Sequence, residues 1–144
     1  MSALTVDANV WVAAFEPRDS HHFISVAFLT SVSRRGVVLR APELLLVEVA
    51  SALARRLGDT EAGRRGLWSV NSHPALRLDP LTGPRVLRAA ALSAHLRIRG
   101  ADAIYAATAD AFKAPLISWD EELVARAGAM TPAQFLDRRV AAGA

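Results

Sequence analysis

Cysteine is absent from the 144 residues of the chain. Its absence excludes disulfide frameworks, thiolate zinc sites, iron–sulfur clusters and cysteine nucleophiles, and it fits a reducing compartment. No apolar run approaches the roughly 18 residues that a membrane span needs. No basic leader precedes the first apolar stretch, as a secretory signal would require. We therefore expect a cytoplasmic protein without a membrane segment.

Lysine is nearly absent, because Lys113 is the single lysine beside sixteen arginines. Lys and Arg together number 17 against 14 Asp and Glu, which gives a formal net charge of +3. A total so close to balance neither identifies nor excludes a nucleic-acid partner. The glycine-rich motifs G-x-x-x-x-G-K-[ST] and G-x-G-x-x-G are also missing, so we do not expect a nucleotide cofactor.

Hydrophobic residues make up 52% of the chain, and they are distributed in short apolar runs that alternate with helical patterns. This alternation predicts an α/β fold, with a short parallel sheet flanked by helices on both faces, in a single domain over residues 1–144. The runs predict strands at 3–6, 37–41, 75–78 and 115–118, with an edge strand at 129–131. The patterns predict helices at 8–15, 19–34, 42–57, 60–72, 83–97, 101–113, 120–127 and 132–142.

Two aspartates follow predicted strands directly. Asp7 follows Leu4–Val6, and Asp120 follows the strand over 115–118. Ligands of parallel sheets bind beyond the carboxyl ends of the strands, which places both side chains at the functional edge. The alternative is that each caps the next helix, and Ser118 with Glu121 fits a capping box.

Two further acids lie on predicted helices. Glu48 is the single charge in the stretch from Leu44 to Ala54, and a helix that is apolar on nearly every side is a buried one. A carboxylate there must be paired, neutral or bound to something, and an ion pair with Arg55 or with a distant arginine is the structural alternative. Asp102 opens a helix, where the alternative role is a favourable interaction with the helix dipole.

As a set, the four carboxylates would repel one another unless a cation lay among them. Hard oxygen ligands of this kind suit Mg²⁺ or Mn²⁺. A metal held in this way can activate water and stabilise a phosphoryl transition state. The pattern therefore indicates metal-assisted hydrolysis of a phosphodiester.

Four segments, in this order and spacing, resemble PIN domains, and most closely the VapC-type ribonuclease toxins of bacterial toxin–antitoxin pairs. The segments are Val6–Trp11, Leu46–Leu53, Ala101–Ala109 and Ser118–Asp120. The resemblance spans the whole chain. It implies a Rossmann-like parallel sheet with an acidic pocket.

The resemblance also implies a site and partners. Asp7, Glu48, Asp102 and Asp120 would hold one or two Mg²⁺ or Mn²⁺ ions for cleavage of RNA by a metal-activated water. Asn9 and Ser118 match supporting positions, although threonine is commoner than serine at the second. A homodimer and a small VapB-like antitoxin are implied as well, with an antitoxin arginine pairing with the carboxylates.

Neighbouring residues leave some assignments open. Glu121 and Glu122 could replace or join Asp120 as ligands. His21 and His22 are adjacent, so in a helix their rings point about 100° apart, and we interpret them as an ordinary helix start. Arg97 and Arg99 precede Asp102 and are the strongest candidates for binding RNA phosphates.

Two other functions are consistent with parts of the pattern. One is a PIN-like module that binds RNA or a protein without cutting. The other is a phosphatase of the haloacid dehalogenase type with Asp7 as nucleophile, although such enzymes need a second aspartate where this chain has Asn9.

Overall fold

The computed structural model describes residues 3–143, and in that part of the chain four strands form one parallel sheet. The strand order is β3-β2-β1-β4, and each neighbouring pair is parallel. The prediction of a short parallel sheet is therefore confirmed. The strands are β1 (Ala3–Val6), β2 (Val38–Pro42), β3 (Leu76–Asp79) and β4 (Leu116–Ile117).

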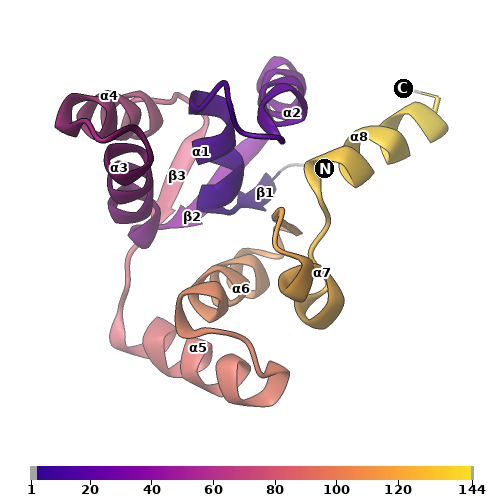
Figure 1. Ribbon diagram of the computed structural model, residues 1–144. Coiled ribbons are helices and arrows are strands. Elements are labelled where there is room, and N and C mark those ends of the chain that lie inside the picture. The colour runs from indigo at the N-terminus through magenta and orange to yellow at the C-terminus, as the bar shows by residue number, and fades with distance from the viewer. Residues whose placement is uncertain (1–2, 144) are drawn as a thin grey trace.

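Helices connect the strands and cover both faces of the sheet, as predicted. The chain steps from β1 to β2 to β3 in one direction and then crosses back to β4. Right-handed crossovers consequently place α1–α4 on one face and α5 and α6 on the other, as Figure 1 shows. The helices are α1 (Ala8–Phe15), α2 (His22–Arg34), α3 (Leu44–Leu57), α4 (Thr60–Asn71), α5 (Gly83–Leu96), α6 (Gly100–Phe112), α7 (Glu121–Ala127) and α8 (Pro132–Ala141).

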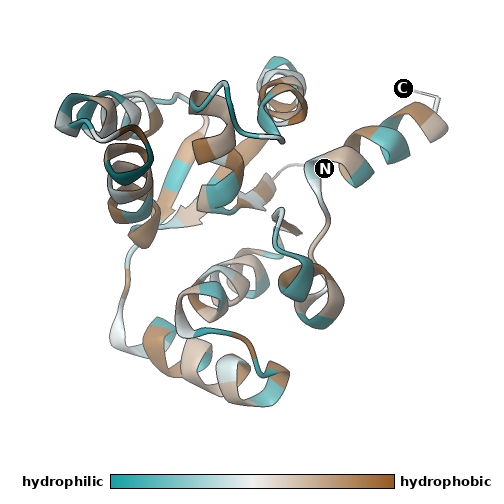
Figure 2. Cartoon of the chain, in the orientation of Figure 1, coloured by the Kyte–Doolittle hydropathy of each residue, from teal (hydrophilic) through white to brown (hydrophobic). Residues whose placement is uncertain are grey.

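The hydrophobic core lies between the sheet and these helices. Its largest fully buried side chains include Trp11 on α1, Phe28 on α2 and Tyr105 on α6. The outer helices α4 and α8 carry hydrophilic bands along their length, as expected for helices with a solvent-facing side (Figure 2). None of the helices within residues 3–143 is long and apolar enough to cross a membrane.

The helix pair α3 and α4 packs closely at a glycine. A Cβ atom at Gly63 would lie 2.6 Å from the carbonyl oxygen of Ala50 and 3.0 Å from the Cβ of Ala54. Real Cβ atoms do not approach a backbone oxygen so closely, so this position requires glycine. The contact helps to fix α3, which carries Glu48.

Several element boundaries differ from the sequence prediction by one or two residues, and three differences change an element's start, end or type. Pro42 is the last residue of β2 rather than the first of a helix, and α2 begins at His22 instead of residue 19. The expected edge strand at 129–131 is a single bridge between Ile117 and Met130. It stops there because Thr131 forms a capping box with Gln134 and starts α8.

Candidate active site

Asp7 is buried at the carboxyl end of β1. The residue is 6% exposed, and its amide N–H donates to the carbonyl oxygen of Ile117 at 3.0 Å, which extends the contact of β1 with β4. It occupies the N-cap position of α1, yet its carboxylate makes no capping hydrogen bond. Instead the carboxylate accepts a hydrogen bond from the Ser118 hydroxyl at 2.7 Å. Capping, the structural alternative, is therefore not the role of this side chain.

The charge of Asp7 has no counter-ion among the described residues, since none of the ion pairs in residues 3–143 includes it. Burial raises the pKa of Asp7 to about 7, against an opposing effect of the Ser118 hydrogen bond. The charges of Glu48 and Asp102 raise it further. A nearby cation would reverse this shift by favouring the ionised form.

Ser118 connects the ends of β1 and β4. Its hydroxyl donates to Asp7 and accepts from the side-chain amide of Asn9 at 3.1 Å and from the backbone N–H of Asp120 at 3.0 Å. The other side-chain atom of Asn9, its oxygen, accepts from the backbone N–H of Trp119 at 3.1 Å. Both residues that the resemblance marks as supporting thus contact the segments that carry Asp7 and Asp120.

Glu48 lies on α3 and is half-buried, where it faces a tyrosine from another helix. The Tyr105 hydroxyl donates to its Oε1 at 2.6 Å. Burial raises the pKa of Glu48, the tyrosine hydrogen bond lowers it, and the charge of Asp102 raises it again. Arg55 is exposed, and none of the ion pairs in residues 3–143 includes Glu48, so the alternative of a pair with Arg55 or with a distant arginine is wrong. The helix is also less enclosed than expected, because Val47 is 66% exposed.

Asp102 and Asp120 share one arginine. The Arg99 Nε lies 3.3 Å from Oδ2 of Asp102, and its Nη2 lies 3.0 Å from Oδ2 of Asp120. Asp120 also caps α7, because its Oδ1 accepts from the backbone N–H groups of Glu122 and Leu123 at 2.8 and 3.3 Å. The capping alternative is therefore correct for Asp120, although its second oxygen is engaged elsewhere. The expected Ser118–Glu121 capping box is not formed, since Asp120 is the cap residue.

The pKa of Asp102 reflects this crowding of acids. Burial and the charge of Asp120 raise the pKa of Asp102, and Arg99 lowers it. The charge of Glu122 raises it as well, although Glu122 pairs with Arg126 at 2.7 Å. Asp7, Glu48, Asp102 and Asp120 are thus linked electrostatically at the carboxyl edge of the sheet.

The donor set fits a divalent cation in chemistry and in charge. All four groups are carboxylates, which are the ligands that Mg²⁺ and Mn²⁺ prefer, and Asp7 is buried without a counter-ion. Within residues 3–143, however, no three Asp, Glu or His side chains lie close enough together to form a ready-made metal site. The site is therefore open, and the side chains would have to draw together around an ion.

The two adjacent histidines at the start of α2 make separate contacts. The His21 ring stacks on Trp119, with ring centroids 3.8 Å apart and planes 8° from parallel. His22 hydrogen-bonds through Nδ1 to the carbonyl oxygen of Ala13 at 2.8 Å. Their side chains point to different partners, in keeping with an ordinary helix start.

Sequence reasoning missed two residues. Tyr105 lies three residues after Asp102, which places both on one face of α6, and this spacing is the signal that could have identified it. Asp79 is a third aspartate at a strand end, and it is 5% exposed. Its carboxylate accepts from Arg85 Nε at 2.6 Å and Nη2 at 3.3 Å and from the Thr108 hydroxyl at 3.1 Å.

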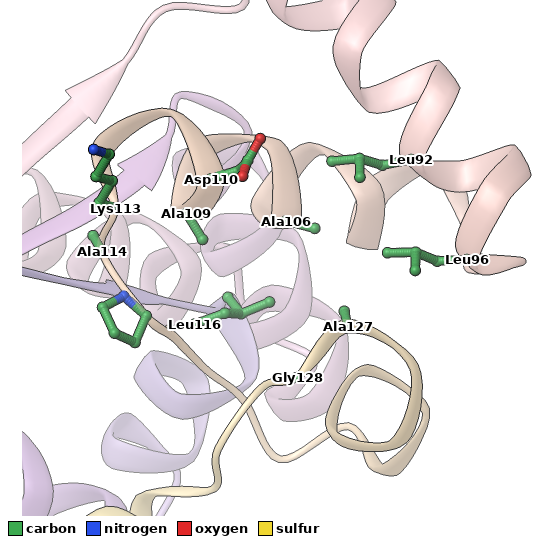
Figure 3. Close-up of a pocket in the computed structure, with 11 residues that line it drawn as sticks. Leu92, Leu96, Ala106, Ala109, Asp110, Lys113, Ala114, Leu116, Ala127 and Gly128 are labelled. Carbon is green, nitrogen blue, oxygen red and sulfur yellow. The ribbon is translucent and has the colours of Figure 1, made fainter.

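Two hollows in the surface differ in whether they include one of the four acids. A groove of about 370 Å³ between α1 and α3 includes Asn9, Glu48 and the exposed Arg55 and Arg56 among its lining residues. A second hollow of about 440 Å³ lies at the other end of α6 from Asp102, where Leu92 and Leu96 of α5 face α6 (Figure 3). The first belongs to the acidic edge, whereas the second is mostly apolar.

The fold is similar to that of solved toxin structures. VapC20 from Mycobacterium tuberculosis, described as a sarcin–ricin loop cleaving toxin, matches with a TM-score of 0.73 at 20% identity over 85% of this chain and 93% of its own. VapBC2 from Rickettsia felis, bound to a promoter DNA fragment, matches with a TM-score of 0.68 at 15% identity over 90% and 96%. A toxin–antitoxin complex from Klebsiella pneumoniae matches with a TM-score of 0.65 at 18% identity over 90% and 97%.

Comparison of the sequence itself gives a family. No curated protein sequence matches the chain. The family model described as PIN domain matches residues 4–129, a range that includes the four carboxylates and both supporting residues. The chain therefore belongs to the PIN domain family.

Proposed function

We propose that the protein is an endoribonuclease that depends on Mg²⁺ or Mn²⁺ and acts as the toxin of a type II toxin–antitoxin pair. Membership of the PIN domain family and the toxin fold support this function. The observation that carries it is the convergence of four carboxylates from four segments on one sheet edge, with Asp7 buried and without a counter-ion.

In this proposal Asp7, Glu48, Asp102 and Asp120 hold the metal. When bound, the ion would activate a water molecule and stabilise the negative charge that develops at the phosphorus. The chain's own contribution is to hold these carboxylates at the edge in usable orientations.

Three side chains position the proposed ligands. The Ser118 hydroxyl donates to Asp7 and so fixes the direction of its free lone pairs. Asn9 holds the Ser118 hydroxyl and the following backbone in place. Tyr105 donates to Oε1 of Glu48 and leaves the other oxygen of that carboxylate free of described hydrogen bonds. Carboxylates held in this way need less rearrangement to bind an ion.

The proposed partners are RNA, a small VapB-like antitoxin and a second copy of this chain. The matched structures include toxin–antitoxin complexes, which supports the antitoxin. An arginine from the antitoxin would pair with the carboxylates, because guanidinium and carboxylate form paired hydrogen bonds. The exposed Arg55 beside Glu48 supplies positive charge for RNA phosphates at the same groove. Its neighbour Arg56 is paired with Asp19 at 2.8 Å.

The test is cleavage of structured RNA by the purified protein in Mg²⁺, in Mn²⁺ and in EDTA. We expect cleavage in either metal and none in EDTA, and we expect Asp7→Asn to lower the rate by about 10³-fold or more. Asp110→Asn is the matched control, because Asp110 is an exposed acid on the far end of α6 that pairs with Arg88. Equal cleavage in EDTA, or by the Asp7→Asn variant, would refute the proposal.

A further inference from the structure

Arg99 is the one cation within residues 3–143 that forms an ion pair with any of the four proposed ligands. It contacts Asp102 and Asp120 together, through Nε at 3.3 Å and Nη2 at 3.0 Å. The two carboxylate side chains are 15% and 17% exposed, whereas the arginine side chain is 75% exposed. The guanidinium therefore lies over these two carboxylates from the solvent side.

The backbone of Arg99 is fixed, but its side chain is not. Arg99 is the N-cap residue of α6. Its backbone is held by the helix, because its carbonyl oxygen accepts a hydrogen bond from the N–H of Ala103 at 2.9 Å. The guanidinium reaches back over the first turn from that anchor. Exposed ion pairs of a long side chain are weak individually, so the guanidinium can leave without disturbing the fold.

We propose that Arg99 is an exchangeable internal counter-ion: it pairs with Asp102 and Asp120 when no metal is present, and a divalent ion must displace it to bind. This inference rests on the proposed function, since it takes both aspartates as metal ligands. At Asp120, Arg99 and the ion need the same oxygen atom, because Oδ2 accepts from the guanidinium and Oδ1 caps α7. At Asp102 the guanidinium takes Oδ2, and its positive charge beside both carboxylates opposes a second cation there.

Displacement has a consequence for the substrate. A guanidinium released from Asp102 and Asp120 stays at the rim of the site, because its backbone is part of the start of α6. Planar guanidinium groups bind phosphate through two parallel hydrogen bonds. Metal binding would therefore free a phosphate-binding side chain next to the site where RNA is cut.

The test is a calorimetric titration of the protein with Mn²⁺, which measures the affinity for the ion. We expect Arg99→Gln to bind Mn²⁺ about three- to tenfold more tightly than the unchanged protein, because two exposed ion pairs no longer compete. Arg99→Lys should fall between the two, since it keeps the positive charge but lacks the planar fork of donors through which Arg99 contacts both carboxylates. Arg88→Gln, which removes an exposed pair with Asp110 away from the site, should bind as the unchanged protein does.

A second measurement follows Arg99 in the unchanged protein. We expect its Nε–H nuclear magnetic resonance signal to move on addition of Mg²⁺ as the guanidinium is released. Equal or weaker Mn²⁺ binding by Arg99→Gln would overturn the inference. So would an unmoved Nε–H signal while the amides of Asp102 and Asp120 respond to Mg²⁺. Absence of Mn²⁺ binding in every variant would instead refute the proposed function itself.

Discussion

Asp7 and Asp79 are two buried aspartates in equivalent places with opposite surroundings. Each follows or ends a parallel strand, and they are 6% and 5% exposed. Asp79 receives two hydrogen bonds from the Arg85 guanidinium and one from the Thr108 hydroxyl. Asp7 receives one side-chain hydrogen bond, from Ser118, and lies near two further acids. Burial alone therefore does not distinguish a structural carboxylate from a functional one.

The difference lies in what balances the charge. A buried carboxylate paired with an arginine is satisfied within the fold, and it holds elements together. A buried carboxylate without a cation destabilises the folded protein in its ionised form, so its retention requires another reason. Asp79 therefore joins β3 to α5 and α6, whereas Asp7 and the acids around it form the site that we propose to hold a cation from outside.

After the loss expected for Asp7→Asn, the largest effect in this comparison is expected at a second residue of the acidic edge. Glu48→Gln should lower RNA cleavage by about 10²–10³-fold, because it removes a proposed ligand charge, while leaving the fold intact. Cleavage rates with Mn²⁺ and thermal unfolding on the same samples test both parts. Glu61→Gln, an exposed acid on α4 paired with Arg64, is the control. Unfolding of Glu48→Gln would make Glu48 a structural residue like Asp79.

A substitution of Asp79, whose charge is balanced by Arg85, should lower the stability of the fold. Asp79→Asn removes the charge that Arg85 faces and should lower the free energy of unfolding by about 2–4 kcal/mol, because a partly buried guanidinium loses its partner. Urea unfolding at pH 7.5 measures it. Asp110→Asn, which breaks an exposed pair, should change stability by about 0.5 kcal/mol or less. A loss at position 79 no larger than this would remove the distinction between the two sites.

The pH dependence of stability should come from Asp7. Its pKa in the folded protein, about 7, lies above the ordinary value of 3.8, so the folded state binds the proton more tightly. Its contribution is therefore fully present below about pH 4 and is lost as the pH rises through 7. In the absence of metal, Asp7→Asn should stabilise the protein at pH 8 by roughly 2–3 kcal/mol relative to its effect at pH 4. Urea unfolding across this range would contradict the comparison if both proteins showed the same slope.

The smallest expected effects concern the two hydroxyl groups. Thr108→Val removes one hydrogen bond to a buried aspartate and should lower stability by about 1 kcal/mol. Ser118→Ala also removes the acceptor of the Asn9 amide and of the Asp120 N–H, so its loss should be about 1–2 kcal/mol. The loss for Ser118→Ala should be larger at pH 8 than at pH 5, because its hydroxyl stabilises the ionised form of Asp7. The loss for Thr108→Val should be nearly equal at both values. Identical pH behaviour of the two variants would show that the two aspartates have similar environments.

The sequence was sufficient for the architecture because short apolar runs and strand–helix alternation are local patterns. It was also sufficient to place Asp7 and Asp120 just beyond the ends of β1 and β4, because a charge that follows an apolar run is visible in the chain itself. The pairings were not visible, since Tyr105 reaches Glu48 across 57 residues and Arg99 reaches Asp120 across 21. Such contacts depend on how helices pack. The spacing of Tyr105 from Asp102 places both on one face of α6, but it does not specify the residue of another helix that Tyr105 contacts.

Asp79 also shows this limit of sequence reasoning, because its position in the sequence suggests a role that its partners in the structure do not support. It ends a strand of four residues, a pattern like that before Asp7, yet Arg85 lies on the following helix and Thr108 on the next. Sequence position alone would have suggested a fifth site residue. The three-dimensional structure identifies its role by supplying the partners.

The most direct test of the account is the titration of the Asp7 carboxyl group by carbon-detected nuclear magnetic resonance, with and without Mg²⁺. The account predicts a pKa of about 7 without the metal and a markedly lower value with it, because a bound cation favours the ionised form. Titration near the ordinary value of 3.8, unchanged by Mg²⁺, would contradict it. In that case Asp7 would need no cation from outside the fold.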